Sequence, residues 1–256
     1  MSVASDDTTG ASDLRAVVEK DPALATKILR IVNSSAAAAR HRVSDLTTAI
    51  TLLGFKQVRN IAMTIYVSRV FRSEVMYLSY SREDLWNHSV AVASTSRMIA
   101  GVCGGPAEEA YVAGLLHDIG LILLDQSLRR YLRKIIDQLD GERCTTEIER
   151  EILSFDHAEL GEFVALRWEL PEQVSAAAGY HHAPSHYEGE HTMTVHSVAL
   201  ANYLCSRHGL KSLGNNCVLQ PGEETYRCLG IQKQQMEEIV HGLGESIDFA
   251  SSIVDA

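Results

Sequence analysis

The sequence predicts an all-α protein. Apolar residues recur three or four positions apart along most of the 256-residue chain, and no persistent two-residue alternation marks a sheet. Pro22, Pro106 and Pro171 each precede a run with helical spacing, and proline is favoured in the first turn of a helix. With 46% hydrophobic residues, a chain of this length can bury a substantial core.

The first two helices are marked by residues that suit their ends. Apolar positions from Leu24 to Val32 follow helical spacing, and Asp21 before Pro22 is a candidate N-cap. A second helix is expected to begin after Ser44 and to end at Gly54, since glycine favours the C-terminal cap.

The remaining helices are expected at about 56–71, 82–100, 107–124, 128–139, 158–168, 172–182, 194–207 and 232–243. Ser81 and Asp84 resemble a capping box at the start of one of them. A charged run covers Glu147 to Leu153, and loops are expected at 182–191 and 209–222. We place the boundary between a smaller N-terminal lobe and a larger C-terminal lobe at Ser73 to Ser81.

Charge and hydropathy exclude several classes of partner. The chain has 23 Lys and Arg against 33 Asp and Glu, and its net charge of -10 opposes nucleic-acid binding. No apolar run approaches the roughly 20 residues of a membrane span, and the N-terminus has no signal-peptide pattern, so we expect a soluble cytoplasmic protein without a membrane partner. The cysteines are odd in number, contain no CxxC pair and are expected to be reduced: Cys103, Cys144, Cys205, Cys217 and Cys228.

The segment AYVAGLLHDIGLILL carries the clearest chemical signal. His117 and Asp118 interrupt an apolar helix that should be buried. Burial of an imidazole beside a carboxylate is costly unless the two are hydrogen-bonded or share a cation. Both groups can bind one metal ion, so the pair is a candidate metal site.

Other histidines are placed to join this pair. The helical pattern puts His88 and His181 on inward faces, His182 beside the latter, and His157 at the start of a helix that Asp156 can cap. For any one of these histidines, a hydrogen-bonded core or capping role is the simpler alternative. Taken together, they predict a shared polar or metal-binding centre.

The order of these histidines resembles the HD superfamily of metal-dependent phosphohydrolases. The run DPALATKILRIVNSSAAAARHRVSDLTTAITLLGFKQVRNIAM, followed by WNHSVAVA, GLLHDIG, DHAELG, W-x-LP and HH, resembles the HDOD family, named for the HD-related output domain. The similarity covers about residues 12–207. It implies a two-lobed helical HDOD fold, with an N-terminal lobe at about 12–75, an HD-like helical core at about 81–207, and a C-terminal helical extension at 208–256 packed on the core.

The resemblance also implies a function and a site. HDOD proteins act mainly in bacterial signalling and regulation, often without demonstrated catalysis. The residues matching the metal site of HD proteins are His88, His117, Asp118, His157, His181 and His182. Such an imidazole-rich set suits iron, zinc, manganese or nickel. Asn33, Ser34 and Ser35 fall in the N-terminal signature tract, where side-chain to backbone bonds at a helix end are the simplest role.

Two departures from the hydrolase pattern bear on catalysis. Asn202 stands where the resembled hydrolases place a closing aspartate, which removes one negative charge. The tract APSHYEGEH after His182 differs from the HHExxDGxGYP pattern of cyclic-dinucleotide phosphodiesterases, so degradation of cyclic di-GMP is disfavoured.

Two functions therefore follow from the sequence. The first is a regulatory signal-transduction module that binds a protein partner or a small-molecule ligand, with little or no catalysis. The second is a metal-dependent phosphohydrolase, either a phosphodiesterase or a nucleotidase, in which Asp118 is catalytic. A di-iron oxygenase on the same scaffold is a third, remoter alternative. The sequence identifies neither the partner nor the oligomeric state.

Overall fold

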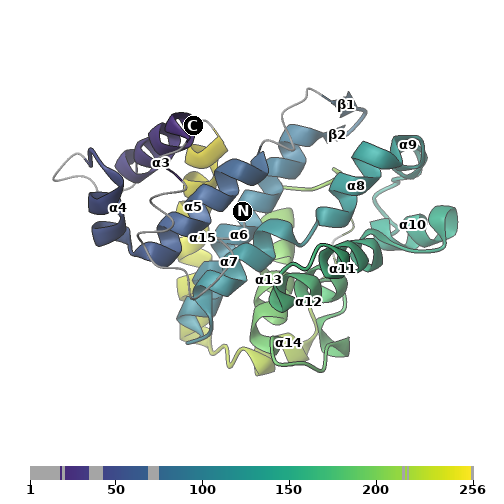
Figure 1. Cartoon of the computed structure of the whole chain (residues 1–256). Helices are drawn as coiled ribbons and strands as arrows, with labels where there is room; N and C mark the ends of the chain where they lie inside the picture. Colours follow the sequence, from purple (N-terminus) through teal and green to yellow (C-terminus); the bar gives the residue numbers. More distant parts are fainter. Residues whose placement is uncertain are drawn as a thin grey trace. The chain divides into compact units, whose positions relative to one another are not determined.

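The protein is described from a computed structural model, which defines residues 18, 21–34, 43–68, 75–214, 217 and 219–254 (Figure 1). The chain divides into two compact units, one formed by Met1–Arg72 with Asp248–Ala256 and the other by Ser73–Ile247. The defined residues are predominantly helical, which confirms the all-α prediction. The predicted domain limits at 12, 207 and 256 stay predictions, and 12 and 256 lie outside the defined residues.

The first unit contains α3 (Pro22–Ser34), α4 (Leu46–Leu53) and α5 (Phe55–Ser68). The Leu24 amide donates to the Asp21 carboxylate at 3.1 Å, which confirms the predicted first cap. Gly54 ends α4 as predicted, with φ 83°, and its amide donates to the carbonyl of Ile50. That positive φ is a conformation that favours glycine.

Asn33 has the local structural role that the sequence suggested. Its side-chain amide donates to the carbonyls of Leu29 and Val43 at 2.7 and 2.8 Å. Its side-chain oxygen accepts from the Val43 amide at 2.8 Å. Asn33 therefore joins the end of α3 to the chain before α4. The Ser34 side chain and Ser35 lie outside the part that the structure defines.

The second unit begins with a short antiparallel hairpin and continues as helices. Its elements are β1 (Met76–Tyr77), β2 (Tyr80–Ser81), α6 (Arg82–Val102), α7 (Ala107–Leu116), α8 (Ile119–Ser127), α9 (Arg129–Asp137), α10 (Thr145–Leu153), α11 (His157–Arg167), α12 (Glu172–Tyr180), the 3-10 turn η3 (Pro184–His186), α13 (Thr192–Arg207), α14 (Glu223–Cys228) and α15 (Lys233–Val254), which extends into the first unit. Ser81 caps α6, accepting from the Asp84 amide at 2.9 Å, as predicted.

One expected helix is wrong. The run 107–124 forms two helices, α7 and α8, which are separated at His117 and Asp118. The His117 ring donates a hydrogen bond from Nδ1 to the carbonyl of Gly114 at 2.7 Å. A carbonyl at the end of α7 therefore accepts from a side chain. The chemical motif is therefore also the point where the chain changes direction.

The core of the second unit surrounds α6. This helix is buried along most of its length and packs against α7 and α13. Small residues such as Ala91, Ala93 and Ser96 allow close helix packing on several sides. In the part of the chain that is defined, no helix combines the length and apolar character needed to span a membrane.

Candidate metal centre

The six residues singled out in the sequence lie together in the second unit. They come from the middle of α6, the break between α7 and α8, the first residue of α11 and the end of α12. Each ring or carboxylate lies near at least one other member of the set, which is His88, His117, Asp118, His157, His181 and His182. Five of these residues are buried, and His182 is half-buried.

Two glycines permit the close packing that gathers these residues. A Cβ at Gly114 in α7 would lie 2.8 Å from the Ser96 hydroxyl and 3.0 Å from the backbone of Ala93, both on α6. A Cβ at Gly120 in α8 would overlap the backbone of His157 at the start of α11. Any larger residue at either position would force these helices apart.

Hydrogen bonds to the backbone fix the orientation of three rings. Nδ1 of His88, His117 and His181 lies 2.8, 2.7 and 2.9 Å from main-chain carbonyl oxygens. A carbonyl only accepts, so each Nδ1 carries the proton and each Nε2 presents a lone pair. The Nε2 atoms of all three rings are buried and have no hydrogen-bond partner.

The Nε2 atoms converge on Asp118. Oδ2 lies 3.6 Å from His88 Nε2 and 3.4 Å from His117 Nε2, and Oδ1 lies 3.4 Å from His157 Nε2 and 3.6 Å from His181 Nε2. These separations exceed an ordinary hydrogen bond of about 2.9 Å. They match the spacing of about 3.4 Å between tetrahedral ligands on bonds of about 2.1 Å. A cation placed between the Nε2 lone pairs and the Asp118 carboxylate attracts both, because both are electron donors.

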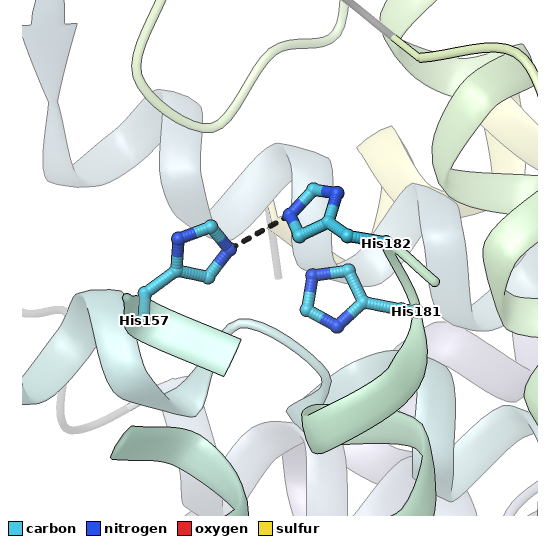
Figure 2. Close-up of side chains that lie close together, drawn as sticks. All are labelled: His157, His181 and His182. Carbon is cyan, nitrogen blue, oxygen red and sulfur yellow. Dashed lines mark hydrogen bonds between the residues drawn. The ribbon is translucent and has the colours of Figure 1, made fainter. Parts of the chain in front are cut away.

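The ligand atoms form two groups, each within 4.8 Å. One group contains His88, His117 and Asp118, and the other contains His157, His181 and His182. Figure 2 shows the second group, in which Nε2 of His157 and Nε2 of His182 are 2.9 Å apart. Because the two oxygens of Asp118 face different groups, its carboxylate can serve both. The donor set therefore fits one or two divalent ions.

A buried glutamate on α10 supports the second group and was missed by the sequence analysis. Glu149 Oε2 accepts from the ring Nδ1 of His157 at 2.6 Å and from its backbone amide at 2.9 Å. A carboxylate behind a metal-binding histidine orients the ring and strengthens it as a ligand. In the sequence, Glu149 was marked only as part of the charged run 147–153.

The electrostatics of the site favour neutral imidazoles beside a charged carboxylate. Burial lowers the pKa of His88 to about 4 and that of His182 to about 3. Burial raises the pKa of Asp118, but the surrounding histidines outweigh it and bring the pKa below its usual range. His157 differs, since Glu149 overcomes the effect of burial and raises its pKa to about 9.

A cavity of about 520 Å³ leads to one side of the centre. Its wall includes Asp118 and the three histidines of the second group, together with Asn202 and Lys211. Asn202 accepts a 3.4 Å bond from Ser206 on the same helix. The position of the missing aspartate therefore borders the cavity, and the centre can be reached by a small molecule.

Comparison with known protein families assigns the chain to one of them. The HDOD domain family matches residues 1–184, and the chain belongs to this family. An uncharacterized protein of Treponema pallidum (strain Nichols) is 28% identical over 194 residues, which are 75% of this chain. The match spans 37% of that relative, so the chain corresponds to little more than a third of its length.

Solved structures share the fold. An HDOD domain protein of unknown function from Geobacter sulfurreducens gives a TM-score of 0.84 at 22% identity, covering 98% of this chain and 88% of the other. A protein from Marinobacter aquaeolei VT8, provisionally assigned to signal transduction, gives a TM-score of 0.79 at 24% identity, covering 98% of this chain and 57% of the other. A provisionally assigned phosphohydrolase from Shewanella amazonensis SB2B gives a TM-score of 0.76 at 19% identity, covering 98% of this chain and 90% of the other.

Proposed function

We propose that this HDOD chain is a regulatory signal-transduction module that holds one or two divalent ions in its histidine-rich centre. The observation that carries the proposal is the convergence of unpartnered Nε2 atoms on Asp118. The ligands are His88, His117, Asp118, His157, His181 and His182, and the donor types suit iron, zinc, manganese or nickel. When bound, such an ion supplies positive charge and Lewis acidity.

The charge of the site indicates the class of small ligand. Asp118 is the only carboxylate among the six residues, and the pKa values of His88 and His182 keep those rings neutral near pH 7. A divalent ion in this set keeps a net positive charge, which attracts anions. Lys211 adds a cationic side chain to the cavity wall. A small anionic ligand therefore fits this module better than a neutral or cationic one.

A metal-dependent phosphohydrolase is the second candidate. The cavity favours it, because the opening gives an anionic ester access to Asp118 and His157. The single carboxylate and Asn202 oppose it, since two ions that activate water and stabilise a leaving group are usually bridged and held by several carboxylates. Asp118 would be the catalytic residue of such an enzyme.

Two assays on the metal-loaded protein separate these functions. Calorimetry with inorganic phosphate tests anion binding, and an aryl phosphodiester tests turnover. The regulatory module binds phosphate only when metal is present and does not turn over the ester. Multiple metal-dependent turnovers would instead establish the phosphohydrolase. Absence of both phosphate binding and turnover would contradict the proposed anionic ligand.

A further inference from the structure

Two cysteines far apart in the sequence meet in the wall of the cavity. The sulfur atoms of Cys144 and Cys217 are 2.8 Å apart, although 73 positions separate the residues. Both are half-buried thiols, and both line the cavity that leads to the centre. This separation is shorter than the about 3.5–4.0 Å of an ordinary non-bonded contact between heavy atoms, so no other group lies between the two sulfurs.

We propose that Cys144 and Cys217 are a redox-sensitive pair that forms a disulfide in the cavity wall. A disulfide bond measures about 2.05 Å, so the two sulfurs need to approach by less than about 1 Å. Cys144 is the N-cap residue of α10, and Cys217 lies in the connection between α13 and α14. The bond would therefore fasten that connection to the start of α10.

The oxidant is a low-molecular-weight disulfide such as oxidised glutathione. Burial and the neighbouring Cys217 sulfur raise the pKa of Cys144. One of the two thiols attacks the glutathione disulfide as the thiolate, forms a mixed disulfide and releases one glutathione thiolate. The other thiol then loses its proton, attacks the cysteine sulfur of the mixed disulfide and releases the second glutathione thiolate. Two protein thiols are oxidised, and one glutathione disulfide is reduced to two glutathione molecules.

The disulfide joins two segments that line the same cavity. Thr145 and Thr146 follow Cys144, and Leu219 and Gln220 follow Cys217, and all four residues line the cavity. Bond formation itself requires only the two sulfurs and an oxidant, so this inference does not depend on a metal ion or on the proposed function.

The test equilibrates the full chain with mixtures of reduced and oxidised glutathione. Non-reducing peptide mapping is expected to join the Cys144 and Cys217 peptides, with the intact mass lower by about 2 Da. The melting temperature of the oxidised protein is expected to rise by roughly 5 °C, because the bond closes a long loop in the unfolded chain. Reduction with dithiothreitol should reverse both changes.

Three variants complete the test. Cys144→Ser and Cys217→Ser each leave one cysteine of the pair without its partner and should form no intramolecular disulfide, whereas Cys103→Ser should form it as the wild type does. Circular dichroism confirms that each variant is folded. A wild-type chain that stays reduced, pairs other cysteines or retains only mixed disulfides would overturn the inference.

Discussion

Two buried aspartates associated with α8 have opposite surroundings. Asp125, whose side chain is 2% exposed, is paired with the guanidinium groups of Arg82 and Arg129. Asp118, whose side chain is 3% exposed, is surrounded by imidazole nitrogens that are too distant for ordinary hydrogen bonds. The chain itself neutralises Asp125. Asp118 faces no guanidinium, and the ring Nε2 atoms around it lie 3.4–3.6 Å away, which is why we interpret it as a ligand and Asp125 as a structural residue.

This difference predicts that the two residues respond oppositely to substitution. Asp125→Ala removes the carboxylate from its buried ion pair with Arg82, whose side chain is 11% exposed. We expect a loss of about 3 kcal/mol in the free energy of unfolding. Urea denaturation measures it, and metal content per folded chain should not change. Asp140→Ala, at an exposed Arg143 pair, is the control and should lower the free energy of unfolding much less.

Asp118→Asn should have the reverse phenotype. The amide keeps the shape of the side chain but removes the charge facing both groups of histidines. We expect metal affinity to fall by at least about 100-fold, since a first ligand is lost. Metal titration with a competing chelator measures this. When excess chelator keeps both proteins free of metal, the free energy of unfolding of the variant should not be lower than that of the wild type. A loss as large as that of Asp125→Ala would show that Asp118 is structural.

Glu149→Gln tests the support behind the second group. The substitution weakens the contact with the His157 ring, where the carboxylate lies 2.6 Å from Nδ1. Metal affinity should fall by about 10- to 100-fold while the fold is kept, as for other residues that orient a metal ligand. Glu151→Gln is the matched control on the same helix, because Glu151 is exposed and contacts Arg143. Equal effects of the two variants would exclude an orienting role for Glu149.

Asn202→Asp should give the smallest effect, in the direction of tighter binding. The new carboxylate adds one negative charge at the cavity wall close to the centre. We expect metal affinity to rise by about 3- to 10-fold, since a nearby opposite charge favours a bound cation. Competition titration measures the change, with Asn202→Ala as the control. An unchanged or weaker affinity would show that Asn202 lies outside the electrostatic reach of the centre.

The sequence predicted the features that depend on local patterns. Helical spacing and capping residues located most helices, and the interrupted apolar segment at His117 identified the motif. The family resemblance assigned the six residues to one site. Their assembly is observed, but their role as metal ligands stays a prediction.

Features that depend on distant packing could not be predicted. Glu149 lies in a strongly charged run, and only the packing around α10 shows that it faces inward. The break between α7 and α8 requires a side-chain bond from His117 that periodicity does not reveal. Cys144 and Cys217 meet across 73 positions, so their proximity has no local signature.

Elemental analysis tests the central claim most directly. The wild-type chain is purified without a chelator or a nickel resin, and metal is measured against protein concentration, with Asp118→Asn prepared in parallel. We predict one to two equivalents of iron, zinc, manganese or nickel in the wild type and nearly none in the variant. A wild-type chain that carries no metal and binds none of the four when they are supplied would contradict the account.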